Sequence, residues 1–122
     1  LLLWSACQRE SLSPVALEGT YEGTFQLEDA PQSIAREGAV TLTLNAERFL
    51  CSGNPNQVPA GGVGSFRLRG QTLEFEHEGV VRPGVKSDMV LQGSYTYAYD
   101  GETLTFWREE GAVRYQYSLR RQ

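Results

Sequence analysis

The feature that most constrains this chain is an alternation of apolar and polar residues that begins at Gly19 and continues almost to the C-terminus. A period of two is the spacing of side chains on a half-buried β-strand, whereas an amphipathic helix has a period of 3.6. The pattern is clearest over residues 89–99, where every second position is taken by Met89, Leu91, Gly93, Tyr95, Tyr97 and Tyr99. β-Branched and aromatic residues, which favour strands, are frequent in the same stretches. The chain is therefore predicted to be all-β.

Turn-forming residues divide the alternating stretches into eight short strands. Tight turns are predicted at 45–48, 70–71 and 100–101, and the other connections at 28–38, 52–63, 78–88 and 109–112. If consecutive strands are antiparallel neighbours, the tight turns share one end of the sheet, the closed end, and the longer loops share the opposite, open end. Eight such strands suit an up-and-down barrel, because closure leaves no exposed edge. An open meander or a two-sheet sandwich is the alternative.

The tight turns also predict which residues face each other. A loop of Gly70 and Gln71 places Phe66 opposite Phe75 and Leu68 opposite Leu73, with Arg67 and Glu74 as a charge pair on the other face. Asp100-Gly101 is a strong signal for a two-residue hairpin. The pairs that follow from it are Tyr97 with Leu104, Tyr95 with Phe106, and Gly93 with Arg108. A turn near Glu110-Gly111 then places Phe106 opposite Tyr115 and Trp107 opposite Arg114.

Length and charge exclude some classes of protein. The chain has 122 residues and a net charge of −4, with a pI near 5.0. This length suits a single domain with a tail. The cationic residues are scattered rather than clustered, which argues against a nucleic-acid partner. The apolar run at the N-terminus is too short to span a bilayer.

The first seven residues read LLLWSAC, an apolar run that ends in two small residues and a cysteine. This resembles the end of a bacterial lipoprotein signal peptide with its lipobox, although Trp4 stands where an aliphatic residue is usual. The resemblance implies a signal remnant over 1–6, lipidation of Cys7, a flexible tether over 7–18 and a barrel domain over 19–122. A short apolar N-terminus that packs on the domain is the alternative.

The strand motifs resemble those of the small lipocalin-like (calycin-type) lipoproteins of Gram-negative bacteria. The motifs are Gly19-x-Tyr21-x-Gly23, the Gly93 to Tyr97 strand, Leu104-x-Phe106 after the Asp-Gly hairpin, and Tyr115-x-Tyr117-x-Leu119. Tyr21 stands where true lipocalins have a tryptophan. The resemblance implies a lipocalin-like barrel in the cell envelope, held at a membrane by its lipid. Gln8 is compatible with outer-membrane sorting, and exposure to the periplasm or to the cell surface stays open.

The inward positions near the open end predict a ligand-binding site. These positions include Arg108, His77, Tyr95, Tyr115 and Gly93. A guanidinium on an inner face needs an oxyanion partner, and tyrosines give amphipathic walls, so the predicted ligand is a small amphipathic or anionic molecule. The alternatives are that Arg108 pairs with a rim carboxylate such as Glu110, Glu78 or Asp88, that His77 is hydrogen-bonded at the rim, and that the inward glycines relieve curvature.

Two other function classes remain beside ligand binding. The loop at 52–63 could dock on a partner protein, as in an inhibitor or an envelope assembly factor, and a filled barrel would favour this alternative. An enzyme is not predicted, since no catalytic triad, paired histidines or phosphate loop can be assembled. A dyad would require Cys51 and His77 to meet, and Cys51 is expected to be a small buried residue. No metal and no cofactor are predicted.

Overall fold

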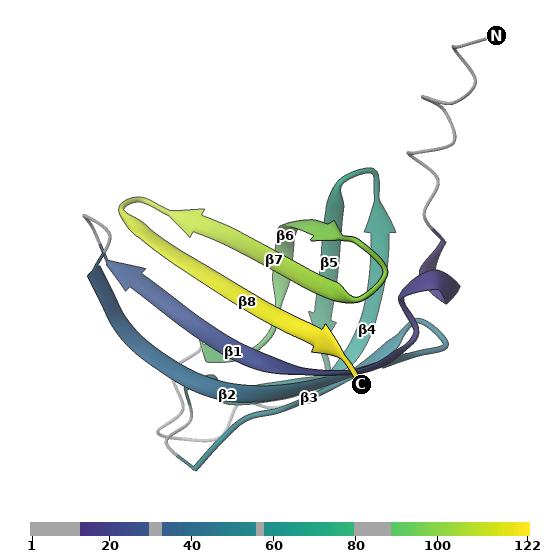
Figure 1. The fold of residues 1–122 in the computed structure, drawn as a ribbon, viewed down its shortest axis with the longest axis horizontal. Helices are drawn as coiled ribbons and strands as arrows, with labels where there is room; N and C mark the ends of the chain where they lie inside the picture. The colour runs from purple at the N-terminus through teal and green to yellow at the C-terminus, as the bar shows by residue number, and fades with distance from the viewer. Residues whose placement is uncertain (1–12, 30–32, 56–57, 80–88) are drawn as a thin grey trace, which may run out of the picture.

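The structure, a computed structural model, describes residues 13–29, 33–55, 58–79 and 89–122. This part of the chain forms a short 3₁₀ helix and eight strands (Figure 1). The elements are η1 (Pro14–Leu17), β1 (Gly19–Asp29), β2 (Ser33–Asn45), β3 (Arg48–Ser52), β4 (Gly61–Arg69), β5 (Thr72–His77), β6 (Gly93–Tyr99), β7 (Thr103–Glu110) and β8 (Val113–Arg121). No helix among these residues is long and apolar enough to cross a membrane.

The strands form a closed antiparallel barrel in up-and-down order. Each strand pairs with the next, and β1 also pairs with β8, which closes the sheet. The predicted fold class is confirmed, and it is consistent with a lipocalin-like fold. The β4–β5 hairpin also has its predicted register, because Phe66 faces Phe75. On the outer face of the same hairpin, Arg67 Nε lies 3.2 Å from Glu74 Oε1.

The β6–β7 hairpin is longer than predicted. Tyr99 faces Leu104, so the connection contains the four residues from Asp100 to Thr103. The cause is the Asp100 carboxylate, whose Oδ1 accepts hydrogen bonds from the backbone N–H groups of Glu102 at 2.9 Å and Thr103 at 2.7 Å. The register is shifted by two residues, and an even shift keeps every side chain on its predicted face.

The β7–β8 hairpin is also shifted by two residues from its predicted register, because Glu110 faces Val113 across a turn at residues 111–112. The observed pairs are Tyr97 with Phe106, Phe106 with Tyr117, Arg108 with Tyr115 and Trp107 with Gln116. All five predicted pairs in these strands are therefore wrong, namely Tyr97 with Leu104, Tyr95 with Phe106, Gly93 with Arg108, Phe106 with Tyr115, and Trp107 with Arg114. The expected cation–π contact still forms along a diagonal, since Arg114 Cζ lies 5.3 Å from the centre of the Trp107 ring.

The β1–β2 connection is the largest departure from the sequence prediction. A loop is predicted over 28–38, but β1 extends to Asp29 and β2 begins at Ser33. The start of β2 contains Arg36 and Glu37 and shows no apolar alternation, so its sequence does not predict a strand. This part of β2 is defined by its pairing with β1. As a result the β1–β2 and β7–β8 hairpins extend side by side at the open end (Figure 1).

The segment before β6 also differs from its prediction. Alternation predicts a strand from Met89, whereas β6 begins at Gly93. Met89 and Leu91 are instead buried in the core as a short segment beside the start of β4. The backbone N–H of Leu91 donates to the Gly61 carbonyl at 3.0 Å, and that of Ala60 donates to the Met89 carbonyl at 2.9 Å. Val90 between them is buried as well and forms an isolated parallel bridge with Gly61, so this segment is buried on both faces instead of alternating.

Aromatic rings fill the described interior of the barrel. The Phe106 ring lies 5.2 Å from that of Tyr95, 4.6 Å from that of Tyr117 and 5.3 Å from that of Phe75. Burial of each such side chain contributes about 1.5–3 kcal/mol to folding. All six tyrosines that the alternation places inward are buried or packed against this core, namely Tyr21, Tyr95, Tyr97, Tyr99, Tyr115 and Tyr117. These rings occupy the interior, so a ligand would have to bind between them and the open end.

The closed end is covered by η1. Leu17 is fully buried in the core, and its carbonyl oxygen accepts a hydrogen bond of 2.7 Å from the Tyr21 hydroxyl. Residues 13–18 were expected to belong to a flexible tether. The structure shows that this part of the tether packs onto the barrel.

Arg121 fastens η1 to the barrel. Its guanidinium donates to the carbonyl oxygens of Glu18 at 2.6 Å and Ala16 at 3.0 Å. It also donates to the hydroxyls of Tyr21 at 3.0 Å and Tyr99 at 2.6 Å. The C-terminal strand and the segment before β1 are thereby joined at one end of the molecule (Figure 1).

Candidate ligand-binding site

Arg108 lies on the inner face of β7 at the open end. It follows the buried Phe106 by two positions and faces Tyr115 on β8. The last pair between β6 and β7 is Thr96 with Trp107. Arg108 therefore stands just beyond the point where the ladder between these two strands ends. Its side chain is 18% exposed.

The guanidinium of Arg108 contacts two rings and one carboxylate. Its Cζ lies 4.0 Å from the centre of the Tyr115 ring and 5.6 Å from that of Tyr95, within cation–π range. Nη1 lies 3.0 Å from Glu110 Oε1, so one of the expected rim pairs does form. The Glu110 side chain is 64% exposed. Nε of Arg108 is buried and has no hydrogen-bond partner in the described part of the chain.

This combination leaves Arg108 with capacity for an oxyanion. A buried N–H group without a partner costs about 1–3 kcal/mol. The exposed ion pair with Glu110 contributes at most about 1 kcal/mol, so another anion can displace it. A carboxylate or phosphate can accept two parallel hydrogen bonds from one edge of a guanidinium. The site can therefore bind an anion that accepts a hydrogen bond from Nε, which Glu110 does not do.

The buried hydroxyls of Tyr95 and Tyr117 and the buried thiol of Cys51 are neutral at physiological pH. Burial raises the pKa of Tyr95, although the neighbouring Arg108 opposes this shift, and burial raises the pKa of Tyr117 further. Burial also raises the pKa of the Cys51 thiol to about 12. A nucleophilic cysteine needs the opposite shift. Arg108 and its partner Glu110 therefore carry the charge at this part of the inner wall.

Of the other predicted site residues, the two tyrosines lie at Arg108 and His77 lies on a different strand. Tyr95 and Tyr115 are brought to Arg108, as predicted. His77 ends β5, with β6 between it and β7, and its Nδ1 is buried without a hydrogen-bond partner among the described residues. The lipidation candidate Cys7 lies outside the described residues.

Two of the inward glycines allow neighbouring strands to approach closely, and the third, Gly93, has a backbone conformation that favours glycine. A Cβ on Gly23 would overlap the carbonyl oxygen of Ser118, and one on Gly64 would overlap that of Glu76. These two glycines therefore permit close approach of strands, which is the alternative to making room for a ligand. Gly93 has φ +106°, a conformation that favours glycine, and no atom lies within 4 Å of the place of a Cβ.

Arg36 is not among the predicted site residues, because residues 28–38 were expected to form a loop. In the structure Arg36 faces Leu27 across β2 and β1, and Leu27 faces Tyr115 across β1 and β8. Tyr115 in turn faces Arg108. Directly opposed residues of antiparallel strands share a face of the sheet. The four residues therefore form one row across the inner wall, with an arginine at each end.

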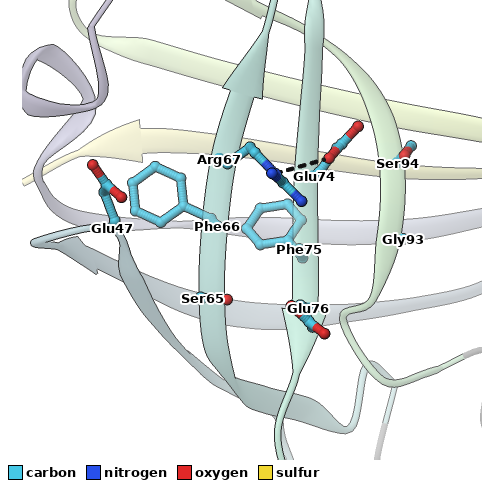
Figure 2. A pocket seen from close by; sticks show the side chains of 9 residues that line it. All are labelled: Glu47, Ser65, Phe66, Arg67, Glu74, Phe75, Glu76, Gly93 and Ser94. Atoms are coloured by element: carbon cyan, nitrogen blue, oxygen red, sulfur yellow. Dashed lines mark ion pairs between the residues drawn. The ribbon is translucent and has the colours of Figure 1, made fainter.

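A separate hollow of about 500 Å³ lies against β4, β5 and β6 (Figure 2). Its polar side chains come from the outer face of the wall, where Arg67 points to Glu74. The carboxylates of Glu47, Glu74 and Glu76 outnumber the one arginine among the residues that line it. This hollow is suited to a cationic group and is distinct from the row that contains Arg108.

The loop after β3 is ordered in its described part and borders an apolar pair. Asn54 holds the loop, because its Nδ2 donates to the Val58 carbonyl and its Oδ1 accepts from the Val58 N–H at 3.3 Å. Leu50 and Val63 face each other on the neighbouring strands, with exposures of 55% and 42%. They are the large apolar residues of the described strands that lie most open to solvent.

No group of three or more His, Cys, Asp or Glu side chains among the described residues is placed to hold a metal ion. Comparison with known protein families, curated proteins and solved structures finds no match for this chain.

Proposed function

We propose that this chain is a non-enzymatic binding protein of the bacterial cell envelope, whose barrel binds a small amphipathic anion at the open end. The observation that carries the proposal is the buried Nε of Arg108, which has no partner among the described residues. An oxyanion would satisfy this donor and compete with the exposed Glu110. The Tyr115 ring beside the guanidinium supports an apolar portion in the same ligand.

The packed core limits how deeply the ligand sits. Phe106 is fully buried, and the Tyr117 ring stacks on it at 4.6 Å. The proposed ligand therefore places its anionic group against Arg108 and its apolar part along the wall of the extended hairpins. This arrangement differs from the interior site that the sequence predicts, although the ligand class is unchanged.

Binding of a fatty-acid probe tests this proposal. Titration calorimetry with dodecanoate should show binding by the wild-type barrel, weakened at least about tenfold in Arg108→Gln, because a bidentate charged contact is lost. Arg67→Gln is the matched control, since it removes an ion-paired arginine from the outer wall. Absence of binding to both dodecanoate and dodecyl phosphate, or equal losses in the two variants, would overturn the proposal.

The proposal includes a lipid anchor on Cys7. Because Leu17 is buried in the closed end, an anchor ten residues earlier would hold that end toward the membrane and leave the open end facing away. Expression of the precursor with and without Cys7→Ser, with labelled palmitate, tests this. Label and membrane association should both be lost in the variant, and a wild-type protein without label would contradict the anchor.

A protein-docking function is the second candidate, and a specific observation favours it. The exposed cross-strand pair of Leu50 and Val63 lies beside the ordered loop that holds Asn54. A hollow of about 600 Å³ borders the same loop. Lysine substitutions at Leu50 and Val63 should then abolish a crosslinked adduct in intact envelopes while leaving dodecanoate binding unchanged. An adduct that survives both substitutions would count against this candidate.

A further inference from the structure

We infer that Arg36 is a second anion-binding residue, and that the open end takes an elongated ligand with an anionic group at each end. The inference rests on the proposed function and narrows its ligand class. It starts from the row of directly paired residues that runs from Arg108 through Tyr115 and Leu27 to Arg36. This row crosses four adjacent strands, namely β7, β8, β1 and β2.

The row has a fixed chemical order. The two middle residues are the aromatic Tyr115, which is buried, and the aliphatic Leu27, which packs against the core. The two outer residues are cationic. The outer positions are separated by three strand spacings, which is about 14 Å along the sheet. A chain with a charged group at each end matches this spacing of the two arginine positions.

The carboxylate next to Arg36 in the sequence is engaged elsewhere. The preceding and following positions of a strand point to the opposite face, and Glu37 there accepts a hydrogen bond of 3.1 Å from Gln26. No described residue makes a hydrogen bond or ion pair with Arg36, whose side chain is exposed. On the inner face Glu110 pairs with Arg108 instead. The row therefore keeps a positive charge at the β2 end.

The ligand class follows from this order. An α,ω-dianion with an apolar middle matches a cationic, aromatic, aliphatic and cationic sequence of contacts. A fatty acid or another monoanion would use Arg108 and the apolar middle alone. Because Arg36 is exposed, its contribution is screened by water and salt, so a modest gain is expected rather than one equal to that of Arg108.

A comparison of two probes tests the inference. Dodecanedioate and dodecanoate have chains of equal length and differ in one carboxylate. Wild-type protein should bind dodecanedioate about fivefold more tightly than dodecanoate at low salt. Arg36→Gln should remove this preference by lowering the dodecanedioate affinity to that of dodecanoate, and Arg36→Lys should restore part of it. Arg108→Gln should weaken both probes at least about tenfold, and the outer-wall control Arg67→Gln should weaken neither.

The outcomes separate the two proposals. If Arg108→Gln weakens both probes but wild-type protein shows no preference for the dianion, the inference about Arg36 is overturned and the proposed function stands. A preference that persists in Arg36→Gln overturns it as well. If Arg108→Gln leaves dodecanoate affinity unchanged, the proposed function itself fails. Equal thermal unfolding midpoints of wild type and the Arg36 variants show that the comparison concerns folded protein.

Discussion

The two ends of the barrel each hold an arginine over a pair of tyrosines. At the closed end, Arg121 Cζ lies 5.2 Å from the ring of Tyr21 and 5.8 Å from that of Tyr99. At the open end, the corresponding contacts of Arg108 are 4.0 and 5.6 Å. The two guanidiniums therefore have similar aromatic surroundings.

The two arginines differ in their acceptors. Arg121 donates to two backbone carbonyls of the segment that includes η1 and to two tyrosine hydroxyls. Arg108 has an exposed carboxylate partner and a side-chain contact with the Tyr95 hydroxyl, and its buried Nε has no partner in the described chain. Similar cation–aromatic contacts therefore contribute to stability at the closed end and leave capacity for a ligand at the open end.

The largest effect is expected when the closed end loses its buried side chain. Leu17→Ala should cost about 2–4 kcal/mol of unfolding free energy, because it leaves a cavity beneath η1. Val15→Ala is the control, since Val15 lies in the same short helix and is 70% exposed. Urea unfolding measures both. Similar small losses in the two variants would show that η1 does not contribute to the folded barrel.

The arginines themselves should separate stability from binding. Arg121→Met should cost about 1–3 kcal/mol, because several hydrogen-bond acceptors lose a charged donor. Arg108→Met should change the free energy of unfolding by less than about 1 kcal/mol, since it removes a buried donor that has no partner, yet it should abolish anion binding. Urea unfolding and dodecanoate titration of both variants check this. A larger loss of unfolding free energy in Arg108→Met than in Arg121→Met would contradict this difference between the two ends.

The neutral interior predicts a loss of stability at alkaline pH. The folded-state pKa of Cys51 is raised to about 12 from an ordinary value of 9.0, so the thiol ionises first in the unfolded chain. Its contribution is complete below pH 9 and falls as the pH rises toward 12, by about 1.4 kcal/mol at pH 10. Cys51→Ala should lessen the pH dependence of unfolding by this amount. An unchanged slope, or rapid alkylation of Cys51 in folded protein at pH 8, would contradict the burial.

The smallest effect is expected from removing the charge of Glu110, whose carboxylate pairs with Arg108. Glu110→Gln should strengthen dodecanoate binding by about two- to fivefold, because the probe no longer competes with an exposed ion pair worth at most about 1 kcal/mol. Glu102→Gln is the control, since Glu102 pairs with Arg120 on the outer wall. Weaker binding in Glu110→Gln would mean that Glu110 is part of the site rather than a competitor.

The fold could be predicted because its main signals are local. A period of two and short turns were enough for eight strands and for the β4–β5 register. The register after Asp100 was not predictable from the Asp-Gly signal alone, because the Asp100 side chain takes two backbone donors and lengthens the connection. Inner-face assignments survived this difference, since the shift was of two residues.

The candidate site was only partly predictable for the same reason. Arg108, Tyr95 and Tyr115 were found from alternation, which reports on which face a residue lies. Arg36 was missed because the start of β2 is specified by pairing with β1 rather than by its own pattern. The role of Arg121 at the closed end was missed as well, because it depends on carbonyl groups more than a hundred positions away in the chain.

Nuclear magnetic resonance of the arginine Nε–H groups tests the central contrast most directly. Arg108→Lys and Arg121→Lys variants assign the two resonances, and dodecanoate is then added to wild-type protein. The account predicts that the Arg108 Nε–H resonance shifts and becomes protected from exchange with water, while the Arg121 resonance stays in place. A saturating addition that moves neither resonance, or that moves Arg121 and leaves Arg108 unchanged, would contradict the assignment of the open end as the binding site.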